Sequence, residues 1–109
     1  MATTYKVIAQ SNPAATTNTD MYTVPASTSI VSSTLTICNQ GTSDATFRLA
    51  IRPLGAALTA VHYVFYDSPV YAKSTVAVTI GITLATTDVV TVYASSANLS
   101  LSLFGSVIT

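Results

Sequence analysis

The chain lacks most of the residue types from which proteins build reactive sites. It contains one cysteine, Cys38, one histidine, His62, no glutamate and no tryptophan among 109 residues. A single cysteine excludes an internal disulfide. One cysteine and one histidine are too few for a zinc site, and dispersed aspartates do not form a calcium loop. We therefore expect neither a metal nor another cofactor.

Catalytic sets of residues are equally scarce. A serine or cysteine nucleophile needs a neighbouring base, and the only histidine lies in the aromatic run VHYVFY at positions 61–66. Cys38 has no cationic neighbour in the sequence that would activate its thiol. A glycosidase pair drawn from the aspartates stays open, although nothing selects such a pair. The aspartates all lie at predicted turns: Asp20, Asp44, Asp67 and Asp88. We expect that the chain is not an enzyme.

Charge of either sign is rare. Only 7% of the residues are charged and the formal net charge is zero, so we expect no basic face for nucleic acid or an anionic membrane. Apolar runs are shorter than the roughly 20 residues of a membrane span. No signal peptide is recognisable at the N-terminus, which predicts synthesis in the cytoplasm.

Strict alternation of apolar and polar residues is the feature that the sequence does have. About eight short segments alternate at a period of two, which predicts antiparallel strands. The strongest, residues 29–53, predicts one β-hairpin that forms the centre of the core. Its expected inward residues are Val31, Leu35, Ile37, Phe47, Leu49 and Ile51. We predict a single domain over 1–109, an all-β antiparallel sandwich of jelly-roll or immunoglobulin-like topology, with a closed barrel as the alternative.

The segments between these strands carry turn-forming residues. We interpret residues 11–20 as a loop or an extended arm, and residues 55–60 as a link from one sheet to the other. Residues 67–69 predict a turn and residues 95–98 a hairpin loop. Gly81 lies inside an alternating segment and indicates a β-bulge or a close approach of two backbones.

Four side chains are candidates for contact with a partner. Arg48 and Arg52 share the predicted solvent side of one strand, about 13 Å apart, where they either face solvent or pair with a partner's carboxylates or carbonyls. Tyr66 and Tyr71 belong to the densest aromatic cluster of the chain. Core packing is the default for such a cluster, but bulky residues on both sides of the strand also favour a subunit contact.

Five short motifs follow one another along the chain, and their order is more specific than any one of them. They are residues 5–13 (YKVIAQSNP), 22–25 (YTVP), 37–39 (ICN), 84–94 (LATTDVVTVYA) and 103–105 (LFG). In this order the chain resembles the small all-β virion structural proteins of tailed bacteriophages, particularly cyanophages. The resemblance covers nearly the whole chain, and it brings no site motif that maps onto particular residues.

The resemblance implies a non-enzymatic protein present in many copies in the virion. The main hypothesis is a capsid cement or decoration protein, trimeric by preference, that binds the major capsid protein or other virion proteins by side-chain packing and strand addition. The alternative is a tail, baseplate or fibre module that attaches to a host glycan. Tyr66, Tyr71 and the loop at residues 95–98 would supply the platform for such a glycan.

Overall fold

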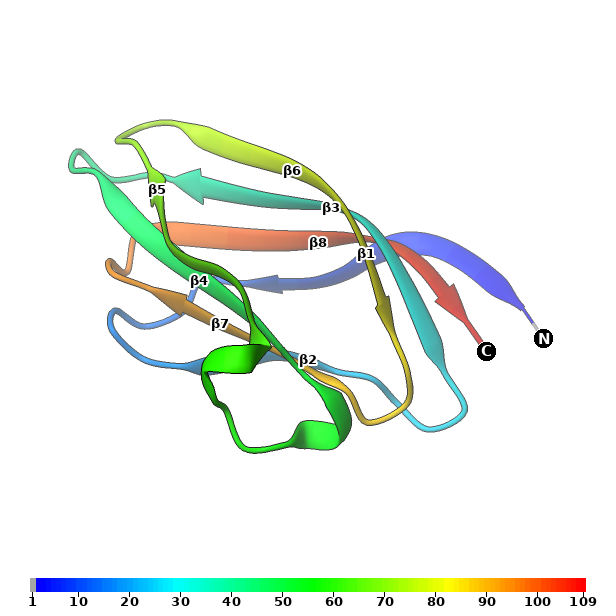
Figure 1. Ribbon diagram of the computed structural model, residues 1–109. Coiled ribbons are helices and arrows are strands. Elements are labelled where there is room, and N and C mark those ends of the chain that lie inside the picture. Colours follow the sequence, from blue (N-terminus) through cyan, green and yellow to red (C-terminus); the bar gives the residue numbers. More distant parts are fainter. Residues whose placement is uncertain (1) are drawn as a thin grey trace.

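Two four-stranded antiparallel sheets pack face to face in the computed structural model, which describes residues 2–109 (Figure 1). The first sheet has the strand order β1-β8-β3-β6 and the second β2-β7-β4-β5. This confirms the predicted β-sandwich and not the closed barrel. The strands are β1 (Thr3–Ser11), β2 (Thr19–Thr23), β3 (Ser29–Asn39), β4 (Ala45–Arg52), β5 (Tyr63–Val70), β6 (Thr75–Leu84), β7 (Val89–Ala94) and β8 (Leu99–Ile108).

The strand pairing identifies the topology as a jelly roll. Antiparallel pairs form between β1 and β8, β2 and β7, β3 and β6, and β4 and β5. Successive pairs belong alternately to the first and the second sheet. The chain is therefore one long double strand wrapped into a sandwich, which is the jelly-roll arrangement and not the immunoglobulin one.

The predicted central hairpin is wrong in its pairing. β3 lies in the first sheet and β4 in the second, so the two arms face each other across the core. The connection is an arch fixed by the buried side chain of Asn39. Its Nδ2 donates to the carbonyl oxygens of Ser43 and Val70, both at 3.0 Å, and its Oδ1 accepts from the amide of Gly41 at 2.9 Å. Alternation reports which side of a strand is buried but not which strand lies beside it.

Two other connections also differ from the prediction. Residues 95–98 join β7 to β8 across the sandwich and are not a hairpin loop. Residues 55–60 lie within a connection between β4 and β5, which are neighbours in the same sheet, so they do not change sheets. That connection contains two short 3₁₀ turns, η1 (Pro53–Gly55) and η2 (Ala60–His62).

The core lies between the sheets and confirms most of the predicted inward residues. Leu35, Ile37, Phe47 and Leu49 are fully buried, and Ile51 is partly buried. Val31 is the exception, with 42% of its surface exposed. Its neighbours Ile30 and Ser32 are buried instead, so the alternation of β3 reverses along the strand.

A row of bulges across the first sheet causes this reversal. The register shifts at Ile8 in β1 and at Ser33 in β3, opposite Ile80 and Gly81 of β6. An extra residue in a strand turns the following side chains to the other face. A bulge at Gly81 is therefore confirmed, whereas the close backbone approach occurs at Gly105. A Cβ atom there would lie 2.3 Å from the carbonyl oxygen of Val31, and one at Gly81 would meet nothing within 4 Å.

Residues 67–69 form a second irregularity, within β5. Asp67 has a left-handed backbone (φ 51°), and the pairing with β4 shifts between Phe65 and Ser68. The predicted turn is therefore wrong, because these residues form a bulge inside the strand. The turn follows at residues 71–74, where the amide of Ser74 donates to the carbonyl oxygen of Tyr71.

The segment at residues 11–20 lies against its own domain. The side-chain amide of Asn12 donates to the carbonyl oxygens of Ala97 and Leu99, at 2.9 and 2.7 Å. Ala15 forms an isolated bridge to Ala94 at the end of β7. Residues 12–18 thus form the connection between β1 and β2 and are anchored to the β7–β8 connection, whereas Ser11 belongs to β1 and residues 19–20 belong to β2.

Candidate functional site

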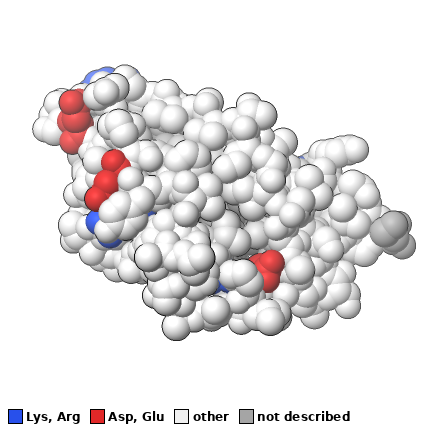
Figure 2. Space-filling view, viewed as in Figure 1, with Lys and Arg blue, Asp and Glu red and all other residues white. Residues whose placement is uncertain are grey.

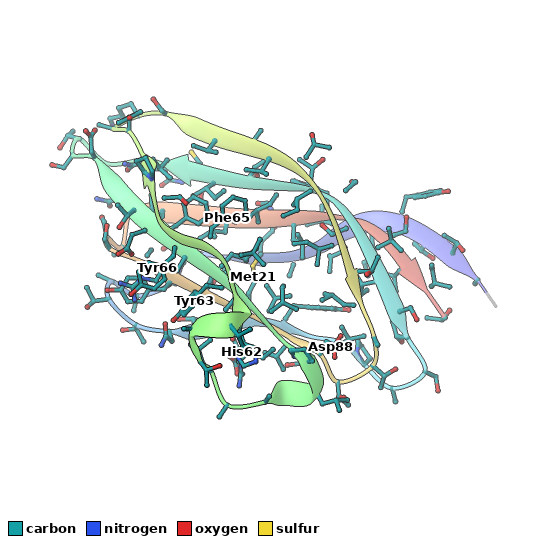
Figure 3. The ribbon with its side chains drawn as sticks, viewed as in Figure 1. Met21, His62, Tyr63, Phe65, Tyr66 and Asp88 are labelled. Carbon is teal, nitrogen blue, oxygen red and sulfur yellow. The ribbon has the colours of Figure 1, made fainter. Side chains whose placement is uncertain are left out.

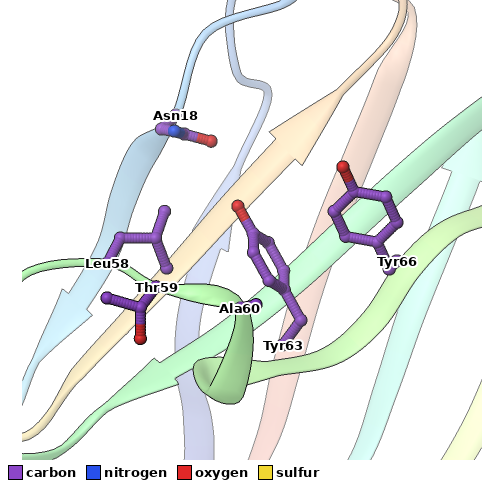
Figure 4. Close-up of a pocket in the computed structure, with 6 residues that line it drawn as sticks. All are labelled: Asn18, Leu58, Thr59, Ala60, Tyr63 and Tyr66. Atoms are coloured by element: carbon purple, nitrogen blue, oxygen red, sulfur yellow. The ribbon is translucent and has the colours of Figure 1, made fainter.

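An open groove lies on the outer face of the second sheet (Figure 4). Its volume is about 770 Å³. The β1–β2 loop forms one side, the β4–β5 connection forms the other, and β5 supplies two aromatic rings. The lining residues are Asn18, Leu58, Thr59, Ala60, Tyr63 and Tyr66.

The two tyrosines of the groove are held against each other. Their rings meet edge to face, with centroids 4.9 Å apart and planes at 87°. Phe65 between them in sequence packs on the other side of the strand against Phe47 of the core, with ring centroids 5.4 Å apart. Figure 4 shows both tyrosine hydroxyls directed the same way, and Figure 3 shows the two rings beside the β4–β5 connection.

Arg48 also packs against the Tyr66 ring. Its guanidinium carbon lies 4.2 Å from the ring centroids of Tyr66 and of Tyr93, the residue opposite Arg48 on β7. Nε donates to Asp67 Oδ1 at 2.6 Å and Nη2 donates to Oδ2 at 3.3 Å. The hydrogen bond to Asp67 raises the pKa of the Arg48 guanidinium above its ordinary value. This charge is therefore paired with a carboxylate and covered by two rings.

Arg52 has a different role, because it binds three other parts of its own chain: β2, β7 and the β4–β5 connection. Its Nη2 lies 2.9 Å from Asp20 Oδ1 in β2. Its Nε donates to the hydroxyl of Thr91 in β7 at 3.0 Å, and its Nη1 donates to the carbonyl oxygens of Gly55 and Ala56. Arg52 thus connects three strands to the β4–β5 connection that forms a wall of the groove.

Two more contacts hold this wall. The amide of Thr59 donates to Nδ1 of His62 at 3.0 Å, which closes the turn next to the groove. Farther along the connection, the amide of Leu54 donates to Asp88 Oδ1 at 3.0 Å. His62 therefore has a positioning role here, and its Nδ1 is the acceptor for this amide.

Three of the four predicted contact residues come together at this face. Arg48, Arg52 and Tyr66 lie on the outer side of the second sheet, whereas Tyr71 lies in the β5–β6 turn and is 62% exposed. Their role in an interface stays a prediction. Sequence reasoning missed Asn18, Tyr93 and the residues 58–60, because only the fold brings these segments to one place.

A second surface feature lies on the outer face of the first sheet. Four apolar side chains, which we call the terminal strip, occupy neighbouring positions in β1, β3 and β8: Tyr5, Val7, Val31 and Phe104. Tyr5 is 82% exposed and Val7 44%. A shallow depression of about 550 Å³ lies beside the strip, lined by Tyr5, Lys6, Ser33, Phe104, Gly105 and Ser106.

Other kinds of site find no support in the described structure. Residues 2–109 contain no group of three or more metal-ligating side chains and no helix long and apolar enough to cross a membrane. Charged side chains on the face shown in Figure 2 are few and form no large patch of one sign. No protein-family model matches the chain, and no curated protein sequence does so either.

Proposed function

We propose that the chain is a non-enzymatic virion structural protein of a tailed bacteriophage. In this proposal it decorates the capsid and strengthens the shell of major capsid proteins. The order of the sequence motifs supports the class of protein. The jelly roll is compatible with it, since this fold is common in viral capsid proteins, although the fold alone does not fix a function.

The terminal strip is the observation that carries the decoration proposal. The bulges at Ile8 and Ser33 turn Tyr5, Val7 and Val31 outward, so apolar side chains lie where a solvent-facing sheet normally has polar ones. β1, which carries Tyr5 and Val7, is an edge strand of its sheet. An apolar strip that includes an edge strand suits binding by side-chain packing combined with strand addition.

The test is binding to purified empty shells, measured by co-sedimentation. We expect the wild-type chain to saturate the shells and Tyr5→Ser with Val7→Ser to reduce occupancy strongly at unchanged melting temperature. Tyr71→Ser is the matched control, because Tyr71 is also exposed but lies outside the strip. Equal occupancy for the strip variant and the control would contradict the decoration proposal. Analytical ultracentrifugation tests the trimer that the proposal favours.

A tail, baseplate or fibre module is the second candidate, and the tyrosine groove favours it. Electron microscopy of virions with labelled protein separates the two candidates. Label over the shell supports decoration, and label confined to the tail supports the second candidate.

A further inference from the structure

We propose that the groove between Asn18, the residues 58–60 and the two tyrosines of β5 binds a neutral oligosaccharide. The inference rests on the second candidate function, the attachment module, and names its ligand class; its failure would leave the decoration proposal standing. The groove lies on the second sheet, whereas the surface proposed for shell contact lies on the first.

The lining of the groove matches the two-sided chemistry of a sugar ring. A pyranose has faces of C–H groups, which pack on aromatic rings, and a rim of hydroxyls. Tyr63 and Tyr66 offer ring surface next to Leu58, and Tyr66 is 58% exposed. The amide of Asn18 and the hydroxyls of Thr59 and the tyrosines both donate and accept hydrogen bonds, as sugar hydroxyls do.

The electrostatics of the groove argue against a charged ligand. None of the six lining side chains is ionic. The nearest cation, Arg48, is paired with Asp67 and covered by the rings of Tyr66 and Tyr93. A phosphate or sulfate would have to displace this carboxylate, whereas a neutral sugar leaves the pair intact.

The shape of the groove argues for a chain of sugars and against an enclosed metabolite. The groove is open to solvent and is not an enclosed cavity, and Figure 4 shows both tyrosine hydroxyls pointing to the same side. A proline-rich peptide also packs on tyrosines, but its backbone offers mainly acceptors and uses only the donors of such a site.

The side chains of the groove are preorganised by contacts within the protein. The Tyr66 ring is held by its contacts with Tyr63 and Arg48, and the β4–β5 connection on the other side of the groove is held by Arg52 and by His62. Sugars bind weakly because they exchange one set of hydrogen bonds with water for another. A site that needs no ordering on binding avoids an entropic cost that such a ligand cannot offset.

The experiment uses the full chain and isothermal titration with cellohexaose, maltohexaose, chitohexaose and neutral polysaccharide from bacterial envelopes. We expect saturable binding of at least one probe with a Kd between about 10 µM and 1 mM. Tyr66→Ala should weaken it by about tenfold or more through loss of the exposed ring. Tyr66→Phe should weaken it less, because the ring remains.

Tyr71→Ala is the matched control, since Tyr71 is similarly exposed (62% against 58% for Tyr66) but lies in the β5–β6 turn, and it should bind like wild type. Heparin and a polyproline peptide serve as charged and peptide probes. The inference is overturned if no neutral glycan binds, if heparin or the peptide binds in preference, or if Tyr66→Ala and Tyr71→Ala behave alike. The melting temperature of each variant shows that lost binding is not lost folding.

Discussion

The carboxylate of Asp67 holds the guanidinium of Arg48 between two tyrosine rings, with Nε and Oδ1 2.6 Å apart. The left-handed backbone of Asp67 gives this carboxylate its place, because the bulge displaces it from the regular course of β5. An irregularity of one strand thus organises the aromatic face of the second sheet.

We predict that Asp67→Asn destabilises the protein only slightly. The side chains of Arg48 and Asp67 are 22% and 44% exposed, and solvent screens a surface pair of this kind so that it contributes little to stability. Chemical denaturation in low salt measures the difference in unfolding free energy between the wild type and the variant. This difference should become smaller in high salt, because salt screens the pair in the wild type. A loss of several kcal/mol would mean that the pair does more than attach two surface side chains.

Arg52→Ala should cost more than Arg48→Ala. The Arg52 side chain is 16% exposed, and its removal leaves the hydroxyl of Thr91 and two carbonyls of the β4–β5 connection without this donor. We expect about 1–3 kcal/mol of lost stability from denaturant unfolding. Lys6→Ala is the control for loss of a surface cation and should change little. Because Arg52 stabilises the fold, weaker binding of Arg52→Ala to shells would be explained by lost stability as well as by a lost interface contact.

Gly105→Ala and Gly81→Ala should have opposite effects. At Gly105 an added Cβ atom meets the backbone of Val31 and Ser32, at 2.3 and 2.7 Å, so the strands must separate. We expect a loss above about 3 kcal/mol or failure to fold. At Gly81 the added atom meets open space, and the loss of backbone freedom in the unfolded chain should stabilise by about 0.4–1 kcal/mol. Thermal unfolding of the two variants side by side tests the pair.

Asn39→Asp should be nearly as harmful as Asn39→Ala. Aspartate keeps the acceptor for the amide of Gly41 but loses both donors to the carbonyls of Ser43 and Val70 at a buried site. We expect about 2–4 kcal/mol for either change. Hydrogen exchange should show faster opening of the β3–β4 arch before the rest of the core. If Asn39→Asp unfolds like wild type, the donors are not what holds the arch.

The local pattern of the sequence predicted the strands better than it predicted their neighbours. Alternation identified the buried sides of β4 and β8, because the order of apolar and polar residues within each strand determines which side is buried. The pairing of β3 with β6 and β8 depends on residues far along the chain. The turn between β3 and β4 looked like a hairpin, since turn-forming residues also form arches between sheets.

The candidate site was predictable only in part, for the same reason. Arg48 stood out as a cation on the predicted solvent side of a strand, and Tyr66 as a member of the densest aromatic cluster, for which core packing was the default. Their mutual contact, and the arrival of Asn18 and Tyr93 beside them, arise from the wrapping of the double strand. The alternation of apolar and polar residues carries no information about contacts between side chains that are distant in the sequence.

The row of bulges through Ile8 and Ser33 also has a consequence for comparing this chain with others. On either side of Ser33, odd and even positions of β3 exchange burial and exposure. A relative that lacks one bulge would be one residue shorter there. An alignment without a gap at that point would match core positions of one protein to surface positions of the other over half a strand.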